Sequence, residues 1–377
     1  MNRKQFIILL ILVVIIGGGG LLIRQRSHDS WENSATTLGG KLLPNFPVND
    51  IAQITIQSGT NEVHLIRADN LWRVRERGNY PANFSQISDW IIKLSDLKVA
   101  QSQDIGPSQL GRFDLLPPGP ATNTATLVEF ADASGKTLDS LLLGKKHMKK
   151  SASPSPAGMG MDDAGWPDGR YVMVGNNTTT LDVISDALDN SEPNPDQWLN
   201  KDFLDVQKPG AIAVQYPVAT NSWKLTRASE TNDWQLADAG PKEKLDSSKA
   251  SGVTSPFSSA SFSDVLPPDT KPEISGLTNT TTVTVNTLDG FTYAAQIGQK
   301  QSDNYPVTFA LSATFAPAAK PADQKILADK LAKEQACQHW IYLIPTYVID
   351  PLLKPRSDLL VVETNSPAVT NTPTGGK

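Results

Sequence analysis

Apolar and polar residues alternate along three short stretches between residues 53 and 74. A spacing of two is typical of β-strands that bury one face. The alternating apolar residues are Ile54, Ile56, Val63, Leu65, Trp72 and Val74. The turn-forming stretches "SGTN" and "RADN" separate them, so the pattern predicts a three-stranded antiparallel meander.

The apolar spacing changes to three and four directly after the meander. Phe84, Ile87, Ile91 and Leu94 follow Asn83, and an asparagine side chain is a favourable cap for a helix N-terminus. The pattern therefore predicts an amphipathic helix that packs on the meander.

The same succession of patterns begins again about 160 residues later. Strands are predicted at residues 212–215 and 223–227, followed by a third that contains Trp234 and Leu236. Asp246 then caps a weaker helix, which Pro256 and many serines interrupt. "NLWRV" at 70–74 and "NDWQL" at 232–236 are thus equivalent, and both tryptophans are expected to cover a core.

The correspondence continues through the rest of the chain. A hairpin at 124–146 that closes on a glycine matches a hairpin at 281–300. The later pairs are 171–174 with 305–311, 179–188 with 339–353, and "NKDFL" with "PRSDLL". A repeat of this length indicates internal duplication. The predicted fold is α+β, with two tandem repeats of antiparallel β-sheet with flanking helices, preceded by one transmembrane helix.

These patterns divide the chain into five regions. A further helix within the last repeat is opened by Pro321. The regions are a transmembrane signal anchor at 1–26, a linker at 27–46, a first repeat at 47–206 with a flexible insertion at 148–169, a second repeat at 207–361, and a disordered tail at 362–377.

The N-terminal anchor is predicted from 18 uncharged residues at 6–23, close to the length that crosses a bilayer. Two basic residues precede the run and two follow it, so the charge rule does not orient it. The five-residue head favours an N-terminus inside. A cleaved signal peptide, with glycines 17–20 near the cleavage site, and a buried soluble helix are the alternatives. No cysteine follows the run, which excludes a lipoprotein.

Several of these segments together resemble the bacterial domain-of-unknown-function 4340 family. They are "LWRV" followed by "YPANFSQISDWIIKLSDLKVA", "RFDLLPPGP" at 112–120 and "LLLGKK" at 141–146. Where the family has a glycine before its leucine, this chain has Asp114, whereas "ISGL" at 274–277 keeps the glycine. The resemblance implies a membrane-anchored companion of ABC-type transport or gliding-motility components, with no defined catalytic or binding residues.

Composition excludes some classes of function. The chain has 377 residues, a net charge of −5 and no basic stripe, which argues against nucleic-acid binding. Cys337 is the only cysteine, so no intrachain disulfide or thiolate metal cluster can form.

Candidate catalytic groups are few. "SGKT" at 134–137 lacks the first glycine of a phosphate-binding loop and joins two predicted strands, so a hairpin turn is favoured there. His28, His64, His147 and His339 have no spacing of a metal site. Cys337 and His339 are more typical of a segment where a helix ends and a buried strand begins than of a catalytic pair. We therefore expect no catalytic residue, no metal and no cofactor.

The insertion at 148–169 is the best candidate for a contact surface. Met159, Met161 and Trp166 are residue types that form adaptable partner contacts, although a local cover over the hairpin is the favoured reading of these three residues. Asp162, Asp163 and Asp168 in the same segment fit a solvated acidic loop, with cation binding as the less favoured reading.

Together these features favour a non-enzymatic protein of the inner membrane. We expect a single membrane pass with the folded domains on the periplasmic, extracytoplasmic side. The expected partners are envelope membrane proteins such as ABC transporter subunits, with no nucleic acid. A glycan- or peptide-binding module is the alternative, and a hydrolytic enzyme the least favoured reading because no nucleophile stands beside a base.

Deleting residues 1–26 should release a soluble, folded protein, because every other apolar segment is short and amphipathic. Sedimentation after a high-salt wash measures the result. If the shortened chain stays with the membrane pellet, residues outside 1–26 also anchor it.

Overall fold

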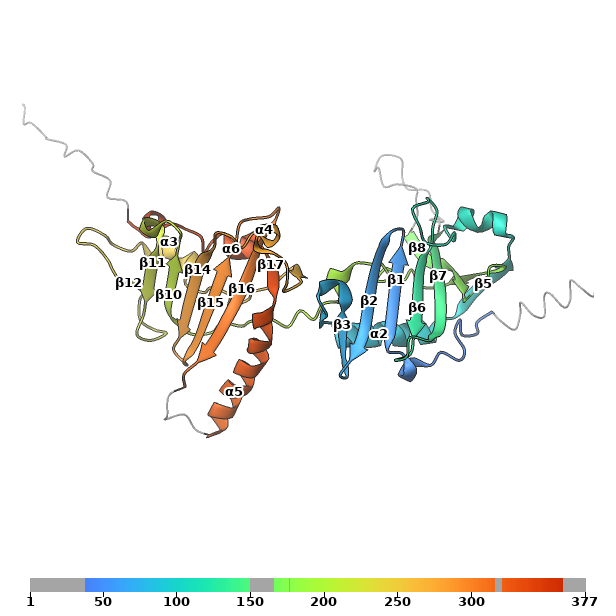
Figure 1. Ribbon diagram of the computed structural model, residues 1–377, viewed down its shortest axis with the longest axis horizontal. Helices are drawn as coiled ribbons and strands as arrows, with labels where there is room; N and C mark the ends of the chain where they lie inside the picture. The colour runs from blue at the N-terminus through green and yellow to red at the C-terminus, as the bar shows by residue number, and fades with distance from the viewer. Residues whose placement is uncertain (1–37, 150–165, 176, 316–320, 362–377) are drawn as a thin grey trace, which may run out of the picture. The chain divides into compact units, whose positions relative to one another are not determined.

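The computed structural model describes residues 38–149, 166–175, 177–315 and 321–361. The chain divides into two compact units, Met1–Asn200 and Lys201–Lys377, which contain the two sheets of Figure 1. The predicted anchor and tail lie outside the described residues. Within the described ranges, no helix is both long enough and apolar enough to cross a membrane.

The first unit is built on an antiparallel sheet of nine strands among the described residues, in the order β4-β3-β2-β1-β6-β7-β8-β9-β5. Its elements are β1 (Gln53–Ser58), β2 (Asn61–Ala68), β3 (Leu71–Val74), β4 (Tyr80–Pro81), α2 (Phe84–Asp96), β5 (Val99–Asp104), β6 (Thr126–Ala131), β7 (Thr137–Lys149), β8 (Trp166–Val174) and β9 (Thr180–Ile184). Short 3₁₀ helices at Val48–Asp50, Arg75–Arg77, Pro107–Phe113 and Pro195–Trp198 connect them.

The predicted meander is confirmed. Ile54 pairs with Leu65, which also pairs with Val74 on its other side, so three apolar side chains form one row across the sheet. All three are fully buried. One face of the sheet is thus apolar, as the spacing of two predicts.

Helix α2 covers part of this apolar face. The Asn83 side chain caps it, accepting a hydrogen bond of 3.1 Å from the backbone N–H of Gln86. Ile87, Ile91 and Leu94 are buried as predicted. Phe84 was expected in the same row but is 64 % exposed, because it stands in the first turn of the helix.

Residues 38–46, which were predicted to belong to the linker at 27–46, pack within the first unit. Leu42 and Leu43 are buried, and the backbone N–H of Leu42 donates to Leu97 at 2.8 Å. The Phe46 ring meets Phe130 edge-on, with 4.9 Å between centroids. These residues add to the core beside β6.

The second unit has an eight-stranded antiparallel sheet within its described residues, in the order β12-β11-β10-β14-β15-β16-β17-β13. Its elements are β10 (Pro209–Gln215), β11 (Trp223–Thr226), β12 (Gln235–Leu236), α3 (Ser247–Ala250), β13 (Asp264–Leu266), α4 (Pro272–Ser275), β14 (Thr281–Thr287), β15 (Phe291–Ile297), β16 (Asn304–Ala313), α5 (Pro321–Gln335), β17 (Ile341–Pro345) and α6 (Thr346–Ile349).

The two strand orders correspond one to one. Strands β3, β2, β1, β6, β7, β8, β9 and β5 match β12, β11, β10, β14, β15, β16, β17 and β13, with β4 as the additional strand. The pairing registers agree as well, since Ile54 faces Leu65 as Ile212 faces Leu225.

Trp72 and Trp234 occupy matching places in this scheme, but their burial differs. Trp72 pairs with Arg67 across the sheet and is 5 % exposed. Trp234 directly precedes β12 and is only half-buried, with the Arg227 guanidinium 4.7 Å from its ring centroid. The expectation that both tryptophans cover a core is therefore wrong for Trp234.

The two apolar faces have different covers. Asp246 caps α3, accepting from the N–H groups of Ser248 and Lys249 at 3.0 and 3.3 Å, but the helix has only four residues. Phe203, Phe257 and Phe262 from loops pack instead against Phe309 and Tyr342.

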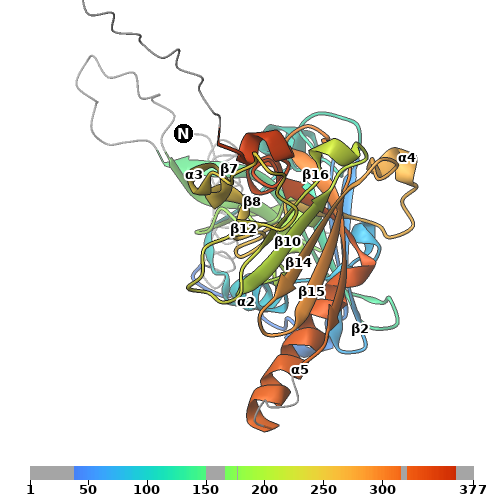
Figure 2. The same ribbon diagram turned by 90° about the vertical axis from the view of Figure 1, so that its left-hand side faces the viewer.

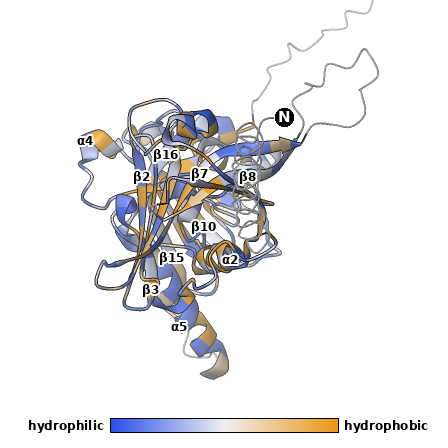
Figure 3. Ribbon diagram, turned by 90° about the vertical axis from the view of Figure 1, so that its right-hand side faces the viewer, coloured by the Kyte–Doolittle hydropathy of each residue, from blue (hydrophilic) through white to orange (hydrophobic). Residues whose placement is uncertain are grey.

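Helix α5 is confirmed at its predicted position and reaches past the ends of the strands (Figure 2). It is mostly hydrophilic (Figure 3), and its last turn holds it to the sheet. There the buried carboxylate of Glu334 accepts a 2.7 Å hydrogen bond from the Tyr293 hydroxyl. Burial and this carboxylate raise the pKa of Tyr293, so the hydroxyl stays a donor.

The turn that lacks the family's glycine is retained. Asp114 adopts a left-handed conformation with φ 56°, where Gly276 has φ 79° in the second unit. In both turns the next residue, Leu115 or Leu277, donates its N–H to a carbonyl five residues back at 3.0 Å. Aspartate tolerates this conformation better than most residues, which explains the exchange.

Two details of the predicted correspondence are wrong. The insertion at 148–169 is not irregular at its ends, because Met148 pairs with Pro167 and Lys149 with Trp166. The segment that matches "PRSDLL" is "PDQWL" and not "NKDFL". Both segments form a 3₁₀ helix. The residue after each 3₁₀ helix, Leu199 or Leu360, forms a β-bridge to the segment that precedes α2 or α3.

Replacing Trp72 by alanine should lower the free energy of unfolding of the first unit by about 3–5 kcal/mol, the usual cost for a buried aromatic side chain. Replacing Trp234 by alanine should lower the free energy of unfolding of the second unit by about 1 kcal/mol, mainly because its exposed cation–π contact with Arg227 is lost. Urea denaturation of each variant measures both. Equal losses would show that the difference in burial has no energetic weight.

Candidate functional site

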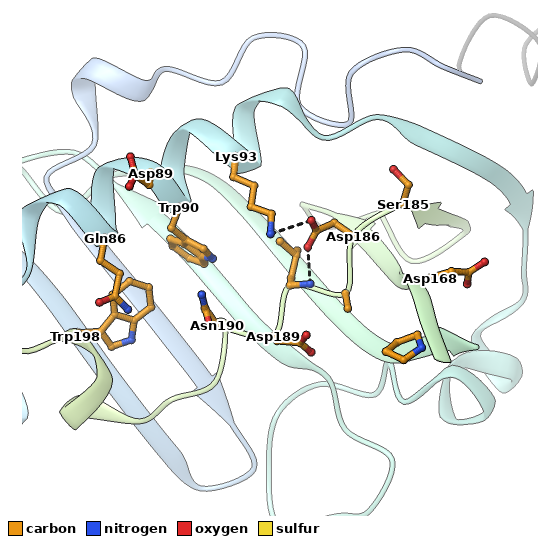
Figure 4. A pocket seen from close by; sticks show the side chains of 13 residues that line it. Gln86, Asp89, Trp90, Lys93, Asp168, Ser185, Asp186, Asp189, Asn190 and Trp198 are labelled. Atoms are coloured by element: carbon orange, nitrogen blue, oxygen red, sulfur yellow. Dashed lines mark hydrogen bonds and ion pairs between the residues drawn. The ribbon is translucent and has the colours of Figure 1, made fainter. Parts of the chain in front are cut away.

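A cleft of about 600 Å³ opens beside helix α2 in the first unit. Its walls come from one flank of α2, from Pro167 and Asp168 at the start of β8, from the loop that follows β9, and from Trp198 (Figure 4). This volume lies in the range of clefts that hold small ligands or several side chains of a partner.

The helical period decides which side chains of α2 face the cleft. Gln86, Asp89, Trp90 and Lys93 lie three or four residues apart, so they share one flank. Trp90 is buried at the base of this flank, where its indole N–H donates to the Ser191 hydroxyl at 3.3 Å.

A second tryptophan lies behind the first. The rings of Trp90 and Trp198 meet edge-on with 5.3 Å between centroids. Trp198 is fully buried, and its indole N–H has no hydrogen-bond partner among the described residues. Both rings are buried, so they form a closely packed part of the cleft wall.

Carboxylates dominate the remaining polar groups, and most of them are paired. Lys93 reaches across from α2 to Asp186 at 2.8 Å (Figure 4). His147 Nδ1 is 2.6 Å from Asp168, and Lys146 pairs with Asp189. The hydrogen bond from Lys146 is the largest cause that lowers the pKa of Asp189, which keeps this carboxylate ionised.

The loop after β9 is held in an unusual conformation. Leu188 has φ 50°, a left-handed value that is unfavourable for a bulky residue. Its side chain is buried, and its backbone N–H donates to the Asp186 carboxylate at 2.8 Å. The conformation turns Asp186 and Asp189 toward the cleft.

Arg170 supports this loop from beneath. Its guanidinium is buried and donates to the backbone carbonyl oxygens of Gly144 at 2.8 Å and Leu188 at 3.2 Å. Burial lowers the pKa of Arg170, opposed by the nearby charges of Glu192 and Asp189. The side chain thus joins β7, β8 and the loop through hydrogen bonds that only a long cation with several donors can make.

The structure describes only some of the residues that were predicted to form a contact surface. Met159 and Met161, with Asp162 and Asp163, lie outside the described residues. Trp166 is described and is 56 % exposed. It stands one residue before Pro167, so the end of the insertion does contribute to the cleft, while Asp168 is engaged by His147.

The other candidates from the sequence stand apart from the cleft. His64 lies between two carboxylates, with Nδ1 2.6 Å from Glu76 and Nε2 2.8 Å from Glu62. His339 is exposed, and Cys337 is buried, which raises the pKa of its thiol. In the described part of the chain, no group of three histidine, cysteine or acidic side chains could hold a metal ion.

"SGKT" is the turn between β6 and β7, as expected. Gly135 has φ 85°, and the Asp132 carboxylate accepts from the N–H groups of Ser134 and Lys136 at 2.8 and 3.0 Å. The backbone donors that a phosphate would need are therefore occupied by Asp132.

The fold is that of an α+β protein, and its first unit carries a cleft of ligand size. The family described as Domain of unknown function (DUF4340) matches residues 72–153, which confirms the resemblance seen in the sequence for that segment. The segment contains α2 and the cleft residues that α2 supplies. No curated protein and no solved structure matches the chain.

Sequence reasoning missed most of the cleft. Lys93 and Asp186 are 93 residues apart, and neither belongs to a recognisable motif. Arg170 had one available signal, because it directly precedes the apolar stretch "YVMV".

Replacing Arg170 by methionine should remove about 3 kcal/mol from the free energy of unfolding of the first unit, because buried carbonyl oxygens lose their donors. The amide hydrogens of residues 185–190 should also exchange faster. Arg170→Lys, which keeps the charge and at least one hydrogen bond, should have an intermediate effect. Unchanged exchange in this loop would show that Arg170 does not position it.

Proposed function

We propose that this protein is a non-enzymatic accessory or scaffold protein of the cell envelope, tethered to the inner membrane, with its two units on the extracytoplasmic side. Its first unit recognises a partner membrane protein through the cleft beside α2. The observation that carries this proposal is a preformed polar cleft in which three of the four carboxylates contact a lysine or histidine.

The pairing of the cleft carboxylates favours recognition over catalysis. A general acid or base must exchange its proton with a substrate, whereas Asp168, Asp186 and Asp189 each contact a lysine or histidine. Ser185 is the one hydroxyl-bearing residue among the described residues that line the cleft, and it has no hydrogen bond to a base there. Fixed ion pairs make a wall whose shape and charge pattern are set before a partner arrives.

The relation between the two units also supports a scaffold. Both keep the same strand order, so we propose that they are tandem repeats of a duplicated unit. The elements that cover the apolar faces differ between the units, because α2 in the first unit has 13 residues and α3 in the second unit has four. In such folds the frame is retained while loops and covers specialise in contacts.

Two features of the sequence support the proposed location and class of partner. The apolar run at 6–23 supports a single membrane pass, and the resemblance to the DUF4340 family suggests ABC-type transport or gliding-motility components as partners.

Binding of an envelope glycan or peptide is the second candidate function. The favouring observation is the mixture of amide and carboxylate groups from Gln86, Asp89 and Asn190 with two tryptophans. The tryptophans are buried, so they offer little ring surface for stacking on a sugar, and we therefore rank this function second.

Co-purification from detergent-solubilised membranes tests the proposal. The full-length chain should recover transporter-type membrane subunits, and the double variant Asp89→Ala, Asn190→Ala should recover at least tenfold less. Both residues are exposed, so the melting temperature should not change. Asp269→Ala, an exposed aspartate in the second unit, is the matched control and should recover as much as the wild type.

Pull-down on isolated cell-wall material distinguishes the second candidate. Retention on this material that disappears in the double variant, without recovery of membrane subunits, would replace the scaffold proposal by glycan binding. Equal recovery of subunits by the wild type and the double variant would remove the cleft from partner recognition.

A further inference from the structure

A second hollow lies on the other flank of helix α2. It is a groove of about 320 Å³ in the first unit, lined mainly by apolar side chains. Phe84, Ile87 and Ile91 supply its helical wall, three and four residues apart, whereas Gln86 and Lys93 face the cleft. The helix therefore separates the apolar groove from the polar cleft.

The groove has a buried floor and an exposed apolar rim. Ile51, Ile87 and Trp72 are almost fully buried beneath it. Phe84 is 64 % exposed at the rim. An aromatic ring left in water beside an apolar hollow costs hydrophobic free energy that a partner side chain would recover.

One cation lines the groove. Arg67 in β2 is the cross-strand neighbour of Trp72. It is exposed, and its side chain has no hydrogen bond or ion pair to any residue that the structure describes. The backbone N–H of Arg67 donates to Ala52 at 2.8 Å, so the strand position is fixed while the guanidinium stays available.

The second unit shows the alternative arrangement of the same pair. Arg227 matches Arg67, since their backbone N–H groups donate to the corresponding carbonyl oxygens of Gly210 and Ala52, at 2.8 Å in both units. The Arg227 guanidinium lies over the Trp234 ring and also donates to the carbonyl oxygens of Pro209 and Glu230. The Arg227–Trp234 pair is thus engaged by contacts within its own unit, whereas Arg67 and Trp72 line a groove.

We propose that the groove binds a short segment of a partner protein that presents an apolar side chain next to a carboxylate. The apolar side chain enters between Phe84 and Trp72, and the carboxylate pairs with Arg67. The volume suits one or two side chains, and tryptophan and arginine are the residue types that most often dominate the energy of protein interfaces. Pairing with a carboxylate adds the bidentate hydrogen bonds that guanidinium groups form.

Fluorescence anisotropy with the full-length chain tests this inference. The probe is a labelled peptide with leucine and phenylalanine between two glutamates, and its analogue has glutamines in place of the glutamates. Arg67→Gln should weaken binding of the acidic peptide at least tenfold and leave the analogue unchanged. Phe84→Ser should weaken binding of both peptides.

The second unit and the cleft provide the controls. Arg227→Gln removes the matching arginine, and Ile274→Ser removes an exposed apolar side chain of the second unit; neither should alter binding. The cleft variant Asp89→Ala, Asn190→Ala should also bind the peptide normally, so failure of this inference and failure of the proposed function are distinguishable.

Two results would overturn the inference. One is equal affinity of the wild type and Arg67→Gln for the acidic peptide, with unchanged melting temperatures. The other is binding of phosphatidylglycerol vesicles that depends on Arg67 and Phe84 in the absence of any peptide binding, which would assign the groove to a lipid surface.

Discussion

Each sheet of this protein has one apolar face, and that face must be covered. Ile54, Leu65 and Val74 form one row of the first sheet, and their side chains would lie in water without a second layer. Burial of such surface is the main favourable contribution to folding. The cover therefore decides the shape of each unit, because the strands alone make the same frame twice.

In the first unit the cover is a helix, and both candidate binding surfaces are consequences of its shape. A helix laid on a twisted sheet contacts it along one stripe only, so hollows remain along its two flanks. The polar flank with Lys93 borders the cleft, and the apolar flank with Phe84 borders the groove. In the second unit, Phe203, Phe257 and Phe262 from loops fill the corresponding place with aromatic packing.

The cleft also depends on a buried cation far from its rim. Arg170 donates to backbone carbonyl oxygens in β7 and in the loop after β9. A buried guanidinium is costly unless it is hydrogen-bonded, so these contacts and the left-handed conformation of Leu188 stabilise each other. The arrangement holds the loop after β9 in one conformation along the wall of the cleft.

The sequence by itself determined the local elements: the alternation at Ile54 and Ile56, the cap at Asn83, and the repeated succession of strand and helix patterns, all of which depend on neighbours along the chain. It also carried the DUF4340 resemblance, confirmed at 72–153. It could not determine that Trp72 is buried while Trp234 lies half-open under Arg227, or that Lys93 meets Asp186. Those outcomes depend on side chains that only the packing of distant strands, loops and helices brings together, and no spacing along the chain records such contacts.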